Sequence, residues 1–368
     1  MCYNLDNDGS DIVKKIMTVL KDGKLKSGYL YFYVHFVVEV LCFYSLTKLL
    51  GDTPFLWFAP LLYDCLAFTP QSLIGYLKDK IAKIDVSYIG LALLILGLIL
   101  LNMTNLNPYI SLLALCLGNA CLHVDGAEVT LKTGCGLLSP SAIFVSGGSF
   151  GVITGKLIAN TNLSPWYLVI LGLTAIPFIV LSHIYESEIN DKGKTCKNFD
   201  YANPSIPPRL IILGSVFIVI VRGYMGYGLP TSWNKTILET IILYCAMGFG
   251  KALGGILSDA YGIRTVAIGS SILSLPFLIL GDNMMFISLI GVLLFSMTMS
   301  ITLAILVSVL KRTPGLAFGL TTIGLFLGTV PIFFFKITST FINCAIIVVF
   351  TLLCTSIFKF ILRGDKDE

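Results

Sequence analysis

Two acidic side chains lie where an apolar environment is expected. Glu39 and Asp64 fall inside long apolar stretches, each roughly 15 Å from the start of its stretch at a helical rise of about 1.5 Å per residue. A charge at such depth costs on the order of 3 kcal/mol unless it faces a cavity or a partner. Because burial disfavours the ionised form of a carboxyl group, we predict that both residues bind and release protons. A static ion pair or hydrogen bond that only orders the helices is the alternative.

Further polar residues share the helix faces of these two carboxyl groups. His35 lies one helical turn from Glu39, and Gln71 lies two turns from Asp64. Each stretch therefore carries a polar stripe instead of a single charge. We predict that His35 takes part in proton coupling and that Gln71 contacts a substrate.

A third polar cluster lies within one apolar stretch farther along the chain. On a helix, Asn119 and His123 share one face, whereas Asp125 and Glu128 lie on roughly the opposite face. These four side chains cannot all line one cavity. We predict that Asn119 contacts substrate and that His123 either handles protons or makes an interhelical hydrogen bond. Glu128 is expected to pair with Lys132 or to extend toward the bilayer surface.

The second half of the chain contains a buried cation, Arg222. Arginine cannot release its proton, so it requires a protein carboxylate or a phosphate, phosphonate or carboxylate of a substrate. Tyr224 and Tyr227 follow closely and offer hydroxyl groups. Lys156 and Lys251 could serve similarly, but they lie near the outer and inner ends of their segments, where extension toward the two membrane surfaces is the simpler expectation. We therefore predict proton coupling in the first half and anion binding by Arg222, Tyr224 and Tyr227 in the second.

Long apolar segments must position these side chains. The chain has 368 residues, of which 56% are hydrophobic and 12% are charged, about half of the charged fraction of a soluble domain. Helices of about 17–25 apolar residues cross a bilayer. Twelve such segments lie near 28–50, 53–77, 86–105, 107–131, 138–160, 165–186, 208–230, 236–257, 264–281, 283–310, 314–336 and 340–363. The sequence thus predicts an all-α polytopic membrane protein.

Enzyme and cofactor chemistry has no support in the sequence. The chain shows no nucleotide-binding loop, no metal-ligand spacing and no nucleophile triad, so we expect no enzyme, no metal site and no cofactor, with a proton gradient as the energy source. The ten cysteines are scattered through the apolar segments and are expected to be free thiols.

One segment occurs twice and divides the chain. GYLKDKIAK begins at Gly75 and GILSDAYGIRT begins at Gly255, which aligns Asp79 with Asp259. A repeat near half the chain length implies a duplicated membrane domain. We predict an N-terminal segment 1–27, a six-helix bundle 28–186, a linker 187–207, a second six-helix bundle 208–363 and a tail 364–368.

The basic residues predict the orientation in the membrane. Most of the 25 lysines and arginines fall on the side of the two termini, and only Lys48, Lys235 and Lys336 fall on the other. Basic connections stay in the cytoplasm, so both termini are expected on the cytoplasmic side. The membrane is expected to be the plasma membrane. Residues 11–26 predict an amphipathic helix on the inner leaflet or an unstructured basic leader, and no cleavable signal is expected.

Twelve helices, two halves and the repeated loop resemble the major facilitator superfamily. That family's loop reads Gly, three residues, Asp, a basic residue, and then a second Gly and further basic residues. The matching positions are Gly75, Asp79, Lys80 and Lys83 in the first copy and Gly255, Asp259, Gly262 and Arg264 in the second, while Ala82 and Ala260 depart from the pattern. The resemblance implies that these residues lock an outward-facing state.

The loop also has a physical interpretation that needs no family. A glycine lets a neighbouring helix approach closely. The aspartate can accept hydrogen bonds from the first amides of an adjacent helix, or pair with Lys80 or Arg264. Anchoring of the loop at the lipid headgroups is the alternative.

Two further stretches resemble exporters of the same superfamily. GNACLH, which begins at Gly118, is similar to the fourth-helix block of the fosmidomycin-resistance type. Gly148, Gly151 and Gly155 form one small-residue face, similar to the glycine-rich fifth helix of drug and proton antiporters, where it packs against the opposite half. A packing face without directional meaning is the alternative.

We therefore predict a secondary active transporter that exports a small molecule in exchange for protons. A proton symporter for uptake of an organic anion, a lipid flippase of the same fold and a non-transporting scaffold or receptor stay open as alternatives. The expected partners are a small-molecule substrate, protons and the lipid bilayer, without nucleic acid, and the expected oligomeric state is a monomer.

Overall fold

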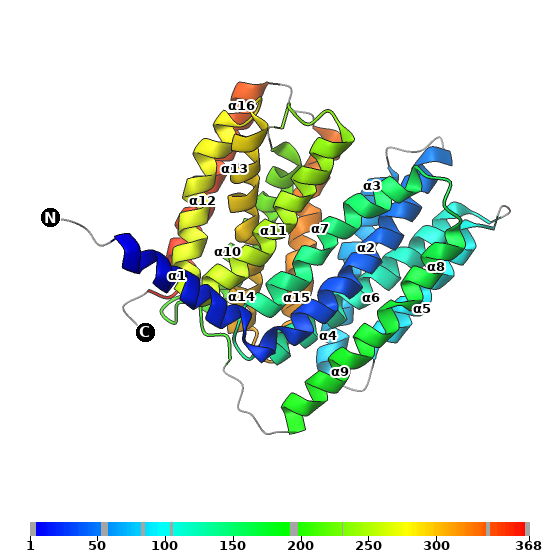
Figure 1. Ribbon diagram of the computed structural model, residues 1–368, viewed down its shortest axis with the longest axis horizontal. Coiled ribbons are helices and arrows are strands. Elements are labelled where there is room, and N and C mark those ends of the chain that lie inside the picture. Colours follow the sequence, from blue (N-terminus) through cyan, green and yellow to red (C-terminus); the bar gives the residue numbers. More distant parts are fainter. Residues whose placement is uncertain are drawn as a thin grey trace.

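The computed structural model describes residues 5–52, 58–81, 85–103, 106–191, 198–229, 231–335 and 339–364. Over these residues the chain is almost entirely helical, and the one β contact is an isolated antiparallel bridge between Ala202 and Leu362. The helices form two groups that stand side by side (Figure 1). We call α1 to α9 the N-half and α10 to α16 the C-half.

The N-half begins with one helix that precedes the first span. Its helices are α1 (Leu5–Leu20), the short 3₁₀ helix η1 (Gly23–Leu25), α2 (Lys26–Asp52), α3 (Ala59–Phe68), α4 (Pro70–Lys80), α5 (Val86–Leu101), α6 (Pro108–Gly134), α7 (Ser139–Ala159), α8 (Pro165–Leu173) and α9 (Ala175–Asp191). The helices of the C-half are α10 (Pro208–Gly228), α11 (Ile237–Tyr261), α12 (Ile263–Leu280), α13 (Met285–Met297), α14 (Met299–Val309), α15 (Pro314–Phe334) and α16 (Thr340–Ile361).

Three of the predicted spans are each split into two consecutive helices. The splits fall at Thr69, Thr174 and Thr298. The first split occurs just before Pro70, because proline lacks the amide hydrogen that would continue the helix. In the described part of the chain, ten helical segments are long and apolar enough to cross a membrane. The other two predicted spans correspond to the shorter apolar helix Val86–Leu101 and to the consecutive helices α3 and α4. The prediction of an all-α polytopic protein with twelve spans is confirmed.

Local sequence signals set several helix ends. Asn107 caps α6 through its side chain, and Pro108 follows at the first helical position, where the missing amide costs nothing. Thr236 and Glu239 form a reciprocal capping box at the start of α11. Gly262 separates α11 from α12 with a φ of +89°, a conformation that other residues rarely adopt.

The first helix lies against the end of the C-half (Figure 1). The Lys15 ammonium sits 5.7 Å from the ring centroid of Tyr261 at the end of α11. Val13 and Met17 leave 60% and 43% of their surface exposed. The described part of the basic leader is therefore helical, and its binding to the inner leaflet stays a prediction.

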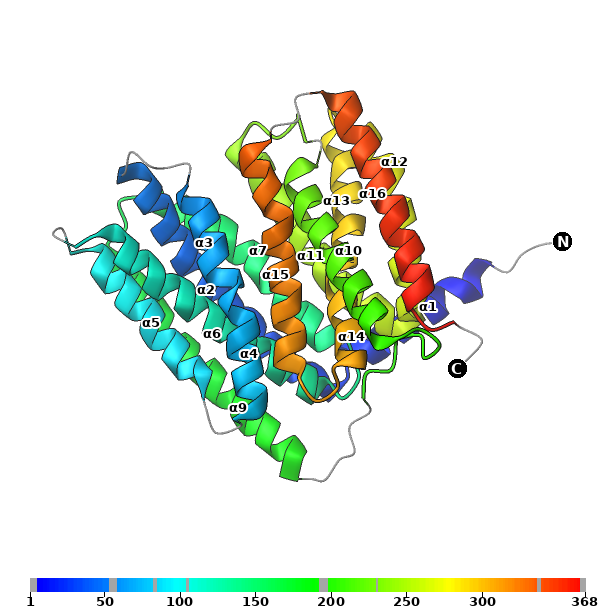
Figure 2. The same cartoon turned by 180° about the vertical axis from the view of Figure 1, so that it is seen from behind.

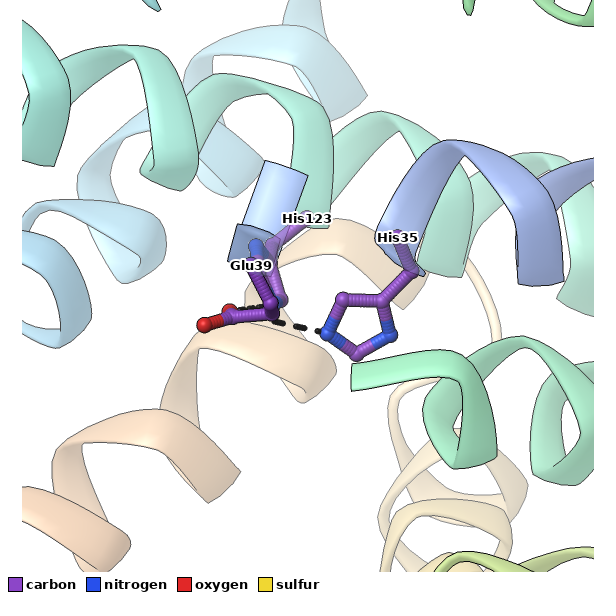
Figure 3. Close-up of side chains that lie close together, drawn as sticks. All are labelled: His35, Glu39 and His123. Carbon is purple, nitrogen blue, oxygen red and sulfur yellow. Dashed lines mark ion pairs between the residues drawn. The ribbon is translucent and has the colours of Figure 1, made fainter. Parts of the chain in front are cut away.

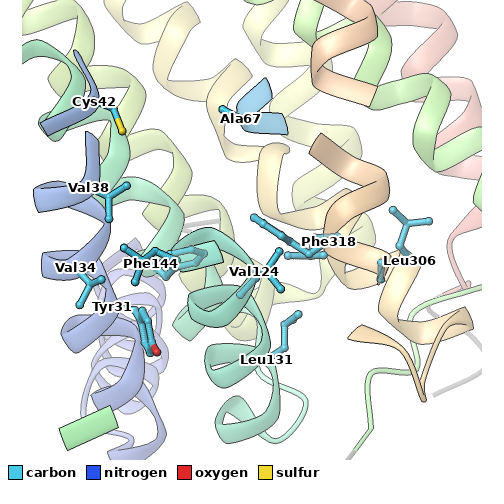
Figure 4. Packing of buried hydrophobic residues seen from close by; sticks show 14 of the residues in the cluster. Tyr31, Val34, Val38, Cys42, Ala67, Val124, Leu131, Phe144, Leu306 and Phe318 are labelled. Atoms are coloured by element: carbon cyan, nitrogen blue, oxygen red, sulfur yellow. The ribbon is translucent and has the colours of Figure 1, made fainter. Parts of the chain in front are cut away.

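The most extensive contacts between the halves are those of α7 with α11 and of α4 with α15 (Figure 2). The buried apolar residues form a core that continues across this junction. Figure 4 shows Phe144 of α7 and Phe318 of α15 within that core, with ring centroids 6.4 Å apart. Because side chains from both halves share it, the junction is a packed contact in this conformation.

The prediction that all cysteines are free was wrong for one of them. Cys135, in the connection between α6 and α7, is disulfide-bonded. Seven other cysteines are free thiols. Sequence spacing could not predict this bond, because it depends on which cysteines approach each other in space.

Candidate functional site

Three of the predicted proton-coupling residues converge at one point (Figure 3). The Nε2 atoms of His35 and His123 lie 3.7 and 3.3 Å from the same Oε1 atom of Glu39. The two imidazole rings are nearly perpendicular, with centroids 4.3 Å apart. All three side chains are buried. α2 supplies His35 and Glu39 one turn apart, and α6 supplies His123 from the neighbouring helix.

Hydrogen bonds fix the orientation of each member of this cluster. The Nδ1 atom of His35 is 2.9 Å from the carbonyl oxygen of Phe144, and that of His123 is 3.0 Å from the carbonyl oxygen of Asn119. The Asn119 side-chain amide donates to Glu39 Oε1 at 3.1 Å and to the Tyr63 hydroxyl at 3.0 Å. Each of the three side chains in the cluster therefore has a hydrogen bond that fixes its orientation.

The glycine face of α7 makes room for the cluster. A Cβ atom added to Gly148 would lie 2.4 Å from His35 Nε2, and one added to Gly151 would lie 2.7 Å from Glu39 Cβ. Gly155 similarly approaches the Val40 carbonyl oxygen. The expectation that this face packs against the opposite half was wrong, because it packs against α2 of the N-half, while another face of α7 meets α11.

Asp64 lies apart from this cluster. It is 7% exposed, and among the described residues it has no hydrogen-bond or ion-pair partner. It is close enough to interact electrostatically with Glu39 and with Tyr227 of the C-half, whose side chain is largely exposed. Gln71 is fully buried, and its side-chain N–H donates to the Ala67 carbonyl oxygen at 2.8 Å across the break between α3 and α4, whereas its Oε1 atom has no hydrogen-bond partner among the described residues.

Arg222 does not join the acidic residues of the N-half. It donates to Thr298, lies 5.2 Å from the Phe295 ring centroid and faces a small pocket whose lining residues all belong to the C-half. Within the described part of the chain it has no carboxylate partner. Tyr224 packs edge-on against Phe350. Arg222 therefore faces a pocket that neither Glu39 nor Asp64 lines.

Two lysines cross between the halves, contrary to the expectation that they extend to the membrane surfaces. Lys251 of α11 donates to Ser149 of α7 at 2.8 Å and interacts electrostatically with Glu39. Lys156 of α7 donates to Tyr244 of α11 at 3.1 Å and lies over the Phe43 ring. Depth could have identified Lys251, since it lies about 15 Å from the nearer end of its helix at 1.5 Å per residue.

An aspartate of each half caps a helix of the other half. Asp79 accepts hydrogen bonds at 3.0 and 2.8 Å from two amide nitrogens at the start of α15. Asp259 accepts at 2.9 and 2.8 Å from two amide nitrogens at the start of α7. Each carboxylate satisfies helix N-H groups that have no partner within their own helix, at the positive end of the helix dipole. We call these two contacts the interdomain caps.

The paired glycines allow these caps to form. A Cβ atom added to Gly75 would lie 2.2 Å from the Gly315 carbonyl oxygen, and one added to Gly255 would lie 2.3 Å from Ala142 Cβ. The basic residues of the loop act elsewhere. Arg264 donates to the carbonyl oxygen of Leu362 at 2.7 Å.

Two other loop residues, Lys80 and Gly262, have contacts of their own in the described part of the chain. The Lys80 ammonium lies 5.7 Å from the ring centroid of Tyr76 on its own helix. Gly262 forms the turn after α11. Lys83 lies outside the described residues.

Loss of the interdomain caps should loosen the contact between the halves. Replacing Asp79 or Asp259 with alanine removes a helix cap that exists only while the halves touch, which costs about 1 kcal/mol, or about a fivefold shift in population. Distances between spin labels on the two halves should lengthen in both variants. Glu239→Ala is the matched control, since Glu239 caps α11 within its own half. An unchanged distance distribution in Asp79→Ala and Asp259→Ala contradicts the prediction.

A buried charge network lies beside the Asp79 cap, on the face of α6 opposite Asn119 and His123. Lys78 pairs with Asp125 and, at 3.3 Å, with Glu128, and its side chain is only 12% exposed. The other members are Tyr31, Asp85, Lys132, His183 and Glu186. The predicted span 53–77 ends just before Lys78, and the structure buries this lysine because the end of α4 packs against α6.

Two groups of helices joined by caps, with polar side chains buried at mid-depth, define an all-α polytopic membrane protein built from two halves. No model of a known protein family matches the chain, and no curated protein sequence matches it either.

Two solved structures share this architecture. FucP, a major facilitator superfamily transporter in the outward conformation, matches with a TM-score of 0.52 and 12% identity over 89% of this chain and 98% of that chain. The human organic anion transporter MFSD10 (TETRAN) matches with a TM-score of 0.56 and 11% identity over 92% of this chain and 99% of that chain. The chain therefore has the major facilitator fold, as predicted, while the similarity to the fosmidomycin-resistance type stays a prediction.

Proposed function

We propose that the chain is a secondary active transporter that moves a small organic anion across the plasma membrane by alternating access and exports it in exchange for protons. The observation that carries this proposal is the pair of interdomain caps. Asp79 and Asp259 close one end of the junction, and each makes two hydrogen bonds that are lost together when the halves rock apart. With both termini in the cytoplasm, these caps close the cytoplasmic side, and the state described is outward-facing.

Asp64 is the residue we assign to proton coupling. It is a buried carboxyl group without a hydrogen-bond or ion-pair partner among the described residues, and it lies near Tyr227 of the other half. A proton bound there removes a charge from the junction, so the energy of bringing the halves together changes with its protonation. This is the property that a coupling site needs.

The substrate class follows from the cations of the junction. Lys251 and Lys156 each reach the opposite half through a hydroxyl group instead of a carboxylate. A ligand carboxylate or phosphate can replace those hydroxyl partners at little cost. MFSD10, which shares the fold, is described as an organic anion transporter. Arg222 is kept as a second candidate anion site, inside the C-half, in a pocket that Tyr224 does not line.

Thermal unfolding of the purified protein against organic anions, organic cations, sugars and lipids tests the proposal. A ligand at about 100 times its dissociation constant stabilises by about 2.7 kcal/mol. We expect stabilisation by one class of anion, lost in Lys251→Gln and kept in Arg222→Ala. Loss in Arg222→Ala alone moves the site to the C-half pocket, and stabilisation by cationic amphiphiles instead contradicts the anion assignment.

Neutralising Asp64 should separate substrate movement from proton movement. In proteoliposomes, the stabilising anion should drive a pH change in the lumen, and Asp64→Asn should abolish that change while anion exchange continues. The direction of the wild-type pH change distinguishes export by exchange from uptake by symport. A full pH response in Asp64→Asn removes Asp64 from the coupling mechanism.

A further inference from the structure

We propose that His35, Glu39 and His123 bind a divalent transition-metal ion of the Zn²⁺ class. The inference rests on the contact geometry of these three side chains alone, and it does not depend on the transport function proposed above. Each side chain directs one potential ligand atom to a common point, and these atoms all lie within 4.8 Å of one another.

The hydrogen-bond pattern leaves this point short of positive charge. A carbonyl oxygen only accepts, so the Nδ1 atoms of both histidines must donate to Phe144 and Asn119. In the neutral rings, each Nε2 atom then carries a lone pair, and both lone pairs face a carboxylate oxygen of Glu39. Three acceptors that face one another repel, unless two protons or one cation lie between them. A single metal ion satisfies all three.

The two distances from the histidine nitrogens to the Glu39 oxygen are close to those of tetrahedral coordination. Two ligand atoms bound at about 2.0–2.1 Å around a tetrahedral Zn²⁺ lie about 3.3 Å apart. The Nε2 to Oε1 distances are 3.3 Å for His123 and 3.7 Å for His35. Two histidines and one carboxylate leave a fourth position for water or another ligand, and the Nδ1 bonds to carbonyl oxygens match the usual outer shell of metal-binding histidines.

The second acidic cluster of the N-half does not offer the same geometry. His183 directs Nδ1 to Asp85 at 3.4 Å and Nε2 to Asp125 at 3.1 Å, so it acts between two carboxylates. Asp125 already pairs with Lys78 and accepts from Tyr31. A metal ion there would compete with Lys78 and Tyr31 for the Asp125 carboxylate.

Metal binding is tested on the purified full-length protein after removal of metals with a chelator. Co²⁺ reports coordination by its visible absorption, and we expect the intense bands of a four-coordinate site, bleached by one equivalent of Zn²⁺. Titration calorimetry with Zn²⁺ should show an affinity at least about tenfold lower in His35→Ala, His123→Ala and Glu39→Gln. His183→Gln, which changes the third histidine of the chain, should bind like the wild type.

Lys251 supplies a variant with the opposite expected effect. Its ammonium interacts with Glu39 from the C-half and opposes a second cation, so Lys251→Gln should bind Zn²⁺ about threefold more tightly. A structural role of the cluster would not produce this gain. The proposal is overturned if wild-type protein gives neither Co²⁺ bands nor Zn²⁺ heat, if binding persists in Glu39→Gln and both histidine variants, or if Lys251→Gln leaves the affinity unchanged. The wild-type spectrum decides the question even where a histidine variant fails to fold.

Discussion

Gly75→Ala is expected to separate the halves at the end that the interdomain caps close. The added methyl carbon would lie 2.2 Å from the carbonyl oxygen of Gly315, and a backbone atom cannot rotate away from it. Overpacking of this kind costs about 3 kcal/mol at its upper range, which lowers the population of the closed arrangement about a hundredfold. The conformation with the halves apart avoids the clash, so the protein should still fold.

Spin labels at the exposed Lys80 and Lys311, with native cysteines replaced, measure this opening directly. The distance distribution should move from short distances in the parent protein to long ones in Gly75→Ala. Gly269→Ala is the matched control, since it also replaces a helical glycine but the new methyl group meets no atom within 4 Å. Equal distributions in all three proteins rule out Gly75 as the contact that permits closure.

Lys78→Met is expected to lower the free energy of unfolding by about 3–5 kcal/mol, because it leaves two buried carboxylates without their shared cation. Asp125 is 1% exposed and Glu128 is 3% exposed, so neither can recover the lost interaction from water. His183 still contacts Asp125 and Lys132 still pairs with Glu128, but each of these cations is shared with a second carboxylate, that of Asp85 or Glu186. The measurement is unfolding in mixed micelles with increasing denaturing detergent.

Two further variants separate charge burial from a general effect of losing a lysine. Lys80→Met, two residues away on the exposed side of α4, should change the free energy of unfolding by less than about 1 kcal/mol. Adding Asp125→Asn and Glu128→Gln to Lys78→Met should restore most of the lost stability, since the neutral side chains need no cation. If Lys80→Met destabilises as strongly as Lys78→Met, the explanation by buried charge fails.

The sequence predicts the spans and the loop repeat well, because both depend on local patterns. Length and apolar composition determine which segments can cross a bilayer. The copies that begin at Gly75 and Gly255 have the same spacing of glycine and aspartate. The predicted hydrogen bonds from the first amides of an adjacent helix to these aspartates are the ones that the structure contains. The separation of His123 from Asp125 on two faces of α6 also follows from helical periodicity alone.

Contacts between helices could not be predicted in this way. The convergence of His35 and His123 on Glu39 requires knowing that α6 packs beside α2. The direction of the glycine face of α7, the burial of Lys78 and the enclosure of Arg222 within the C-half depend on tertiary packing in the same sense. A loop lysine and a buried lysine look identical in sequence, because the difference lies in which helix covers them.

The interdomain caps exchange their partners, since each half supplies the acceptor for a helix start of the other. If the two halves were identical and related by a twofold axis, a single contact between one aspartate and one helix start would occur twice and give both caps. The repeated spacing of Gly75 with Asp79 and Gly255 with Asp259 is what a fused homodimer would keep. Either half produced alone would lack an acceptor for its own α7 or α15. Expressed as separate chains, the two halves should therefore recover native stability only by assembling with each other.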